Sequence, residues 1–333
     1  MKIQIKLLIY GIIYFAVMSL SGCKEEYKTT TKINDDGSCE RIIIAKIDSA
    51  RLLKGAFLVP HDNSWKPEYK TLSRDTQKVF IVHKNFGDVN KINDEYKDSD
   101  KVGIEIKFEK KFRWFFSYLT YTETYKSYNR FNRIPVESFL TKEEYGKLES
   151  GDTGKVLSKK LDKFMEENLF EEFFQQFVSK VKDKKDSPVS MDLLDEKKNE
   201  LRDSLLAGSG EIKSILRSMK NVFKSENIKM YEPDIEEIMK DINSKLERMS
   251  GIEGDYTNEV IMPGIILNTN ANTLEGNKAS WKFNQDRFCF IDHVMSVESR
   301  ITNIWATYVT GAFFLIIVIL LLITGFRKSK TEN

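Results

Sequence analysis

The chain has 333 residues, and its 41% hydrophobic and 12% aromatic side chains are enough for one or two folded domains and too many for a disordered chain. Its 52 basic and 50 acidic residues nearly cancel, so we expect no nucleic-acid partner, which would need a concentrated positive field. Its three cysteines and three histidines form no C-x-x-C or H-E-x-x-H spacing, which argues against a structural zinc site.

Residues 1–22 have the organisation of a secretory signal peptide, because two lysines precede an apolar run over residues 7–20 that is short for a bilayer span. The segment Leu20-Ser21-Gly22-Cys23 resembles the lipobox of bacterial lipoproteins. This resemblance implies cleavage before Cys23, a diacylglyceryl thioether on its sulfur, and fatty acylation (palmitate, for example) of the new amino terminus. An ordinary signal peptide followed by a chance cysteine is the alternative.

Residues 23–140 are predicted to form the first part of a β domain. A hairpin is expected over residues 27–47, because Asp36-Gly37 supplies the positive φ of a tight turn. Another short strand is expected at residues 79–82. From Gly103 to Tyr125 polar and apolar residues alternate with a period of two, which indicates long β structure turned near residues 109–111. The aromatic stripe in this run indicates a sandwich core, with a ligand-binding wall as the alternative.

Residues 141–256 are predicted to be a helical insertion. Thr141-Lys142-Glu143-Glu144 has the form of a capping box, and apolar residues then recur at three- and four-residue steps. After a polar break at residues 182–188, further helices are expected over Met191–Leu206, Glu211–Phe223 and Pro233–Met249.

Strand signals return over residues 257–303, at residues 259–262, 265–268, 279–283 and 287–291. The β signals therefore flank the helical block. We predict an α+β fold in which one mostly antiparallel β domain is interrupted by a helical insertion, with three consecutive modules as the alternative.

Part of this region resembles the closing hairpin of LppM-type lipoprotein domains, in which a Pro-Gly strand leads to an Asn-rich turn and then to a strand carrying Trp. The matching segments are Val260–Ala271, Glu275-Gly276-Asn277 and Ala279-Ser280-Trp281. The opening hairpin after a lipidated cysteine and a single C-terminal span are similar too. The resemblance covers the two β portions, implies an envelope lipoprotein that could contact lipid or glycolipid, and supplies no catalytic residue.

Residues 304–326 are predicted to be one transmembrane helix, because Ala306–Phe326 is uncharged and about 20 apolar residues cross a bilayer. Trp305 and Tyr308 at its outer end suit the headgroup layer, with the alternative that they simply complete the apolar run. The basic tail 327–333 is expected to stay in the cytoplasm, which puts the body outside, as lipidation of Cys23 also requires. We therefore expect a protein of the inner (plasma) membrane that carries a lipid anchor and one span.

Cys39 and Cys289 remain after the lipobox cysteine is assigned. A disulfide between them is one hypothesis, if the first and last β segments are neighbours, and two buried free thiols are the other. The dipeptides His61-Asp62 and Asp292-His293 do not make a site by themselves, because adjacent strand residues point to opposite faces. We predict no catalytic, metal-binding or cofactor-binding residue.

Three functions remain open, in order of preference: a non-catalytic envelope interaction or scaffold module with an envelope protein or lipid partner, a lipid- or glycolipid-binding protein, and a membrane-tethered enzyme. The interior of the folded protein distinguishes these three functions. A filled β core favours the first, an open apolar cavity the second, and a cleft that gathers histidine and acids the third.

Overall fold

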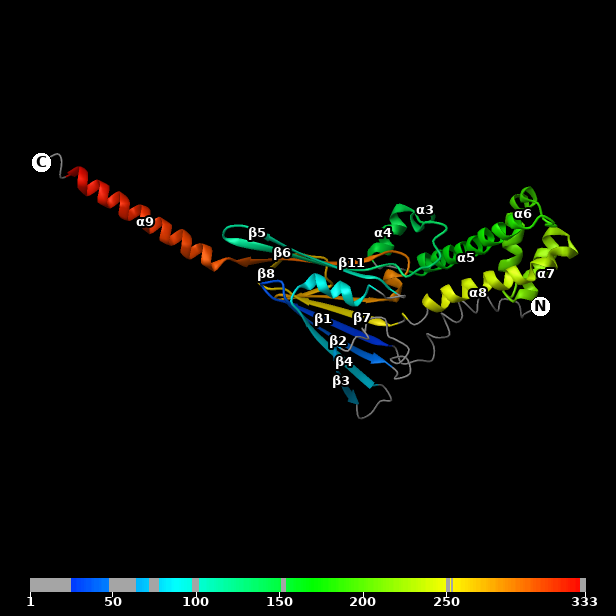
Figure 1. Cartoon of the computed structure of the whole chain (residues 1–333), viewed down its shortest axis with the longest axis horizontal. Coiled ribbons are helices and arrows are strands. Elements are labelled where there is room, and N and C mark those ends of the chain that lie inside the picture. Colours follow the sequence, from blue (N-terminus) through cyan, green and yellow to red (C-terminus); the bar gives the residue numbers. More distant parts are fainter. Residues whose placement is uncertain are drawn as a thin grey trace.

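The computed structural model describes residues 25–47, 64–71, 78–97, 102–150, 154–249, 252 and 254–329. The molecule is elongated, with helices at one end, a two-sheet β body in the middle and one long helix leaving the other end (Figure 1). The described elements, in chain order, are β1 (Glu26–Ile33), β2 (Cys39–Ile47), β3 (Lys66–Thr71), β4 (Lys78–Phe86), η2 (Val89–Glu95), β5 (Ile104–Phe112), β6 (Phe116–Tyr125), α3 (Val136–Phe139), α4 (Lys142–Ser150), α5 (Lys155–Asp183), α6 (Met191–Leu206), α7 (Ile212–Phe223), η3 (Glu226–Tyr231), α8 (Glu232–Met249), β7 (Asp255–Ile261), β8 (Ile265–Thr269), β9 (Thr273–Glu275), β10 (Lys278–Asn284), η4 (Gln285–Phe288), β11 (His293–Thr302) and α9 (Ile304–Ser329).

Two sheets form the β body, with strand orders β3-β4-β2-β1-β7-β10-β9 and β5-β6-β11-β8. β1 and β7 pair in parallel, with Glu26 opposite Asp255, and the other strand pairs are antiparallel. Strands from before and after the helical block therefore share one sheet. This confirms the predicted fold class, a mostly antiparallel β domain interrupted by a helical insertion.

The Pro263-Gly264 turn carries the chain from β7 in the larger sheet to β8 in the smaller one. Gly264 has a φ of 78°, and a Cβ at this position would lie 2.3 Å from the carbonyl oxygen of Arg300. Only glycine permits both the backbone conformation and this close approach. The segment that resembles a closing hairpin therefore crosses between the sheets at Pro263-Gly264, and its later part forms the β9–β10 hairpin of the larger sheet.

Two details of the predicted strands are wrong. Residues 287–291 are not a strand, because the chain forms η4 and a turn there, and the consecutive residues Phe288 and Cys289 are both buried, which an alternating strand does not allow. The strand that completes the smaller sheet is β11, which pairs with β6 along its whole length. The turn expected near residues 109–111 lies instead at residues 113–115, where the Arg113 N–H donates to the Phe116 carbonyl at 2.8 Å.

The helical block follows the predicted pattern closely. The capping box forms at the start of α4, where the Glu144 N–H donates to Thr141 Oγ1 at 3.3 Å and the Thr141 N–H donates to Glu144 Oε2 at 2.8 Å. In α5 the phenylalanines at three- and four-residue steps are buried, and Phe177 packs edge-on against Tyr231 with ring centres 5.0 Å apart. The spacing of apolar residues thus placed the helices correctly.

A buried carboxylate fastens the helical block to the segment that follows β6. Glu172 on α5 accepts from Arg133 Nε at 2.6 Å and from Lys245 Nζ of α8 at 2.6 Å. Asn168, also on α5, accepts from the Ile134 N–H at 2.8 Å. Burial by itself raises the pKa of Glu172, but the bonds from Arg133 and Lys245 outweigh burial and lower it to about 2. The carboxylate therefore stays ionised and holds α5, α8 and the exit from β6 together.

A second buried ion pair lies between the two sheets. Arg41 on β2 and Glu123 on β6 have fully buried side chains, with Nη2 and Oε1 2.7 Å apart. The Tyr121 hydroxyl and the Asn258 amide donate to Glu123 at 2.6 and 2.8 Å. Arg41 also donates to Thr31 Oγ1 at 3.0 Å. Burial raises the pKa of Glu123, but the charge of Arg41 and these hydrogen bonds outweigh it, so the pKa lies below its usual value and the pair stays ionised.

The outer edge of β5 is covered by two asparagines of η2. Asn93 accepts from the Ile106 N–H at 2.6 Å and donates to the Ile106 carbonyl at 2.7 Å. Asn90 bonds the Phe108 N–H and carbonyl in the same way, at 2.8 and 3.3 Å. These amides take the place of a neighbouring strand, which protects the edge from pairing with another chain.

The ion pair between the sheets predicts a strong energetic coupling. Arg41→Met or Glu123→Leu alone leaves an unpaired buried charge and should lower the free energy of unfolding by about 3–5 kcal/mol, whereas the double variant should lose much less than the sum. Denaturant unfolding of the full chain in detergent measures the cycle. The exposed pair Lys107–Glu109 is the matched control, for which Lys107→Met and Glu109→Leu should add independently. Equal coupling in the two cycles would contradict the prediction.

Candidate functional site

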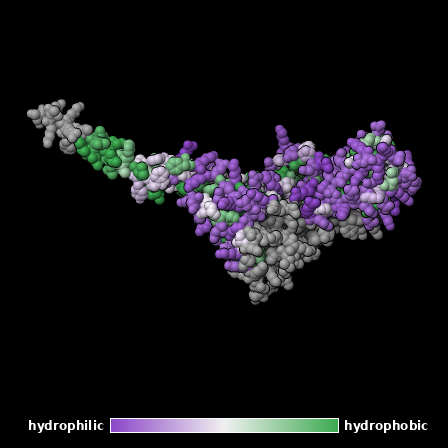
Figure 2. Space-filling model, in the orientation of Figure 1, coloured by the Kyte–Doolittle hydropathy of each residue, from purple (hydrophilic) through white to green (hydrophobic). Residues whose placement is uncertain are grey.

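The apolar part of α9, Ile304–Ile323, has 20 residues, is long and apolar enough to cross a membrane, and is almost entirely unburied by the rest of the molecule. Figure 2 shows it as a hydrophobic helix that projects from a mostly hydrophilic body. A buried core helix would pack against other elements, and this one does not over most of its length. The part of the chain next to α9 is therefore the first candidate functional site.

Asn303 joins β11 to α9 and fixes the start of this helix against the hairpin tip, which we define as residues 110–116 at the turn between β5 and β6. The Asn303 side chain donates to the carbonyl oxygens of Arg113 and Trp114 at 2.7 and 3.2 Å. It accepts from the Ser117 hydroxyl at 3.0 Å, and the Asn303 N–H donates to the Phe115 carbonyl at 2.8 Å. A single side chain thus holds two segments that lie 190 residues apart in the chain.

Aromatic rings extend this junction along α9. Trp305 stacks on Phe112 with ring centres 6.0 Å apart, and Trp114 packs edge-on against Trp305 at 5.4 Å. The Trp114 indole N–H donates to Thr310 Oγ1 at 2.8 Å. The sequence pattern singled out Trp305 as a candidate for the headgroup layer. It missed the hairpin tip, because the tip is part of a strand run and its contact with α9 is made only in three dimensions.

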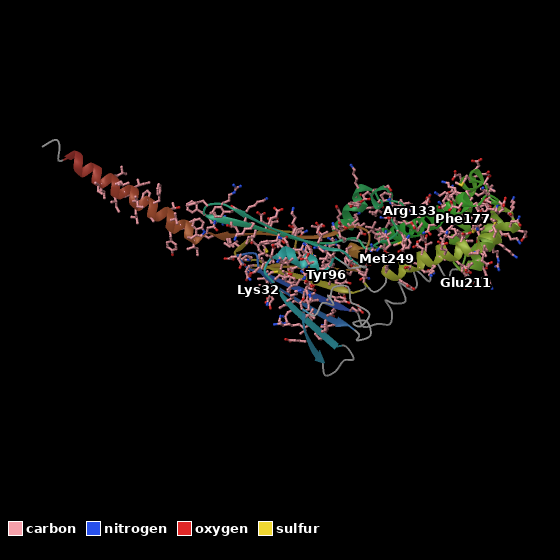
Figure 3. The ribbon with its side chains drawn as sticks, viewed as in Figure 1. Lys32, Tyr96, Arg133, Phe177, Glu211 and Met249 are labelled. Carbon is pink, nitrogen blue, oxygen red and sulfur yellow. The ribbon has the colours of Figure 1, made fainter. Side chains whose placement is uncertain are left out.

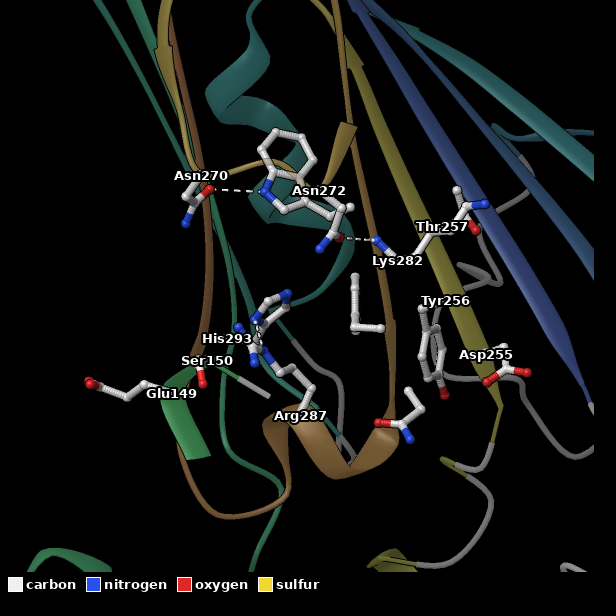
Figure 4. Close-up of a pocket in the computed structure, with 13 residues that line it drawn as sticks. Glu149, Ser150, Asp255, Tyr256, Thr257, Asn270, Asn272, Lys282, Arg287 and His293 are labelled. Carbon is white, nitrogen blue, oxygen red and sulfur yellow. Dashed lines mark hydrogen bonds between the residues drawn. The ribbon is translucent and has the colours of Figure 1, made fainter. Parts of the chain in front are cut away.

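A surface pocket of about 810 Å³ is the second candidate functional site, at the end of the β body nearest α4 (Figure 4). It is lined by residues of α4, β7, β10, η4 and β11 and of the turn after β8: Glu149, Ser150, Asp255, Tyr256, Thr257, Asn270, Asn272, Trp281, Lys282, Phe283, Asn284, Arg287 and His293. Figure 4 shows His293 and Arg287 facing each other, with Glu149 and Asp255 on opposite sides of them.

The histidine of this pocket is neutral. Burial lowers the pKa of His293 to about 4, and the positive charge of Arg287 acts in the same direction. Its Nδ1 accepts from Arg287 Nε at 3.3 Å, and its ring packs against Phe283. The adjacent Asp292 points away, to Lys126 and the Ser127 N–H. Asp292 and His293 therefore do not form one acid–base pair, and among the described residues no group of three or more His, Cys, Asp or Glu side chains could hold a metal ion.

Cys39 and Cys289 are both buried and free, so the structure contains no disulfide between them. Cys39 pairs with Ile33 at one end of β1. Cys289 follows η4 and β10, whose last residue pairs with Asp255 at the level of the opposite end of β1. A strand of this length spans about 23 Å, far beyond the roughly 6.8 Å that a disulfide allows between Cα atoms. Burial raises the pKa of each thiol to about 12.

Cys23, the predicted site of lipidation, lies outside the described residues, as does the dipeptide His61-Asp62. Lipidation of Cys23 therefore stays a prediction from the lipobox.

No protein-family model matches this chain, and no curated protein matches it. Among solved structures, the NMR structure of the folded domain of Mycobacterium tuberculosis LppM is similar, with 10% sequence identity and a TM-score of 0.31. The match covers 85% of this chain and 94% of that chain. It is a distant structural resemblance to the group that the β segments resemble in sequence, and no more.

The neutral state of His293 predicts a stability that depends on pH. Because its pKa falls from 6.5 to about 4 on folding, the unfolded chain takes up the proton first. The contribution of the neutral His293 to the free energy of unfolding is fully present above about pH 6.5. It is lost as the pH falls to about 4, and the loss is up to roughly 3 kcal/mol. The difference in unfolding free energy between wild type and His293→Gln should shrink by this amount over that range, in denaturant titrations of the full chain in detergent. Parallel pH curves for the two proteins would refute this assignment.

Proposed function

We propose that this protein is a non-catalytic module of the cell envelope, anchored to the inner (plasma) membrane, that presents its helical block, at the end of the molecule opposite α9, to a partner. The order of its parts along the long axis carries this proposal: α9 leaves one end, the β body follows, and α5–α8 form the opposite end (Figure 1). In this proposal the β body lies outside the cytoplasm, α9 crosses the membrane, and the basic tail 327–333 lies in the cytoplasm.

The interior of the β body is filled with side chains, which favours a scaffold function rather than a lipid-carrier function. The space between the sheets holds the Arg41–Glu123 pair and buried aromatic residues such as Tyr121 and Tyr125. The pocket around His293 is open to the surface, with amide and charged side chains among its lining residues. A lipid- or glycolipid-binding protein needs a mainly apolar cavity, which this lining does not provide. A membrane-tethered enzyme is the third candidate, which a neutral His293 without an acidic partner does not favour.

The surface of the helical block suits a protein partner. Figure 2 shows this end as mostly hydrophilic. Its acids and bases form ion pairs between helices, such as Lys198–Glu171 and Lys180–Glu237, in which the side chains are part-exposed. Charged surfaces of this kind steer association and select partners.

The predicted lipid anchor and α9 leave the β body at opposite ends. The turn after β1 is on the α9 side, because the Asp35 carbonyl accepts from Lys110, the first residue of the hairpin tip, at 2.7 Å. Figure 3 shows Lys32 on this side and Glu211 at the far end of the helical block. Glu26, the first residue of β1, is therefore about 23 Å further from α9.

This arrangement restricts the posture of the body if both anchors enter one bilayer. Cys23 precedes Glu25 by two residues, and a fully extended link of that length reaches about 7 Å. A body that stands upright on α9 would keep Cys23 more than about 15 Å from the bilayer surface. With both anchors engaged, we infer that the body lies along the membrane.

The proposed partner contact predicts where crosslinks form. A photoreactive amino acid in place of Asn199, exposed on α6, should give protein adducts in native membranes, whereas one in place of Lys282, exposed on β10, should give few. Immunoblots of the irradiated membranes measure the adducts. Adducts confined to Lys282, or none from a series of exposed positions on α6 and α8, would contradict a partner at the helical block.

The double anchor predicts a change of posture on loss of the lipid. Wild type should incorporate a fatty-acid probe, and Cys23→Ala should not. A dye on Glu211→Cys should transfer energy efficiently to acceptor lipids in nanodiscs when Cys23 is lipidated. The transfer should be weak in a Cys23→Ser chain secreted with an ordinary cleavable signal, because a body without the lipid anchor can stand upright. Equal transfer in both proteins would refute the inferred posture, and labelling of Cys23→Ala would refute the lipidation.

A further inference from the structure

We propose that the hairpin tip is a second membrane contact, which places its aromatic side chains in the headgroup layer of an anionic bilayer beside the start of α9. The proposal rests on α9 being the span of the proposed function. It adds a lipid-binding surface from the middle of the chain, far in sequence from either predicted anchor.

The hairpin tip exposes large apolar side chains. Phe112, Trp114 and Phe115 are 55%, 47% and 43% exposed, although they take part in the ring contacts and hydrogen bonds of the junction. Contiguous exposed aromatic residues on a polar body mark an interaction surface. Trp305 and Tyr308 on the first turns of α9 are exposed beside them, at 52% and 74%. Together these rings form one exposed aromatic surface.

The contact with Thr310 fixes the level of this surface relative to the membrane. Thr310 is the seventh residue of α9, so the Trp114 indole reaches about 9 Å along the helix from Ile304. A span that uses the apolar stretch from Ile304 cannot enter the bilayer without bringing Trp114 to the interface. The occupant of the surface is therefore lipid, because the hairpin tip lies alongside a helix that lipid surrounds.

The charges around the hairpin tip favour an anionic bilayer. Lys110, Lys111 and Arg113 alternate with the aromatic residues, and the Arg300 guanidinium lies 4.5 Å from the centre of the Phe116 ring. Two acids lie near these bases: Glu109 pairs with Lys107 and Lys111, and Asp36 lies within electrostatic range of Lys110. Aromatic rings with basic side chains are the composition that binds at a headgroup layer and is attracted to anionic lipids.

Depth-dependent quenching tests the proposal on the full chain. The Cys23→Ser protein, secreted with a cleavable signal, leaves Cys39 and Cys289, which are buried, so an introduced surface cysteine takes an environment-sensitive dye selectively. Three variants are labelled in nanodiscs of equal phosphatidylglycerol and phosphatidylcholine: Phe115→Cys at the hairpin tip, Glu211→Cys at the far end, and Phe314→Cys within α9. Nitroxide lipids carry the quencher at the headgroup or deep in the acyl chain.

We expect headgroup nitroxides to quench the dye at position 115 several-fold more than the dye at position 211, and deep nitroxides to quench position 314 most. Quenching at 115 should weaken in discs of phosphatidylcholine alone. Position 115 as unquenched as 211, with 314 quenched, would overturn the membrane contact and leave the span intact. An unquenched position 314 would instead overturn the span itself. Equal quenching of 115 in both lipid compositions would overturn the preference for anionic lipid.

Discussion

Arg41 and Glu123 carry opposite charges in a place that water does not reach, between two sheets whose shared interior is mostly apolar. A shift of β2 or β6 by one residue would turn either charge outward and leave the other buried alone, which costs several kcal/mol. The pair therefore sets the registers of both strands and the position of one sheet over the other. Tyr121, Asn258 and Thr31 add hydrogen bonds to the pair, which lowers the cost of burying its charges.

The two ends of the β body are related by the placement of β6. At one end β6 begins at the hairpin tip, which Asn303 bonds to the start of α9. At the other end it leads to the segment that Glu172 and Asn168 fasten to the helical block. A strand of ten residues covers about 30 Å, so one continuous strand relates the membrane end to the far end of the β body. The ladder between β6 and β11 stiffens this connection over its full length.

Sequence periodicity predicted much of the fold because it reports local geometry. Met191–Leu206 is a helix with the bounds that the spacing indicated, and the Thr141 capping box forms as written in the sequence. The opening hairpin and the two β blocks around the helices were also predicted. β11 was missed and residues 287–291 were wrongly taken as a strand, because a short alternating run also fits a turn in which Phe288 fills the core between other aromatic rings.

The sequence by itself determined the features that each depend on one stretch of chain: the uncharged apolar length of α9, the lipobox around Cys23 and the helices of the insertion. Tertiary structure alone decided the pairings between distant stretches. It placed Arg41 against Glu123, separated Cys39 from Cys289, put β1 beside β7, and brought Trp114 to Thr310. Local spacing encodes which face of an element is apolar, whereas which faces meet depends on packing and on the matching of charges across the whole chain.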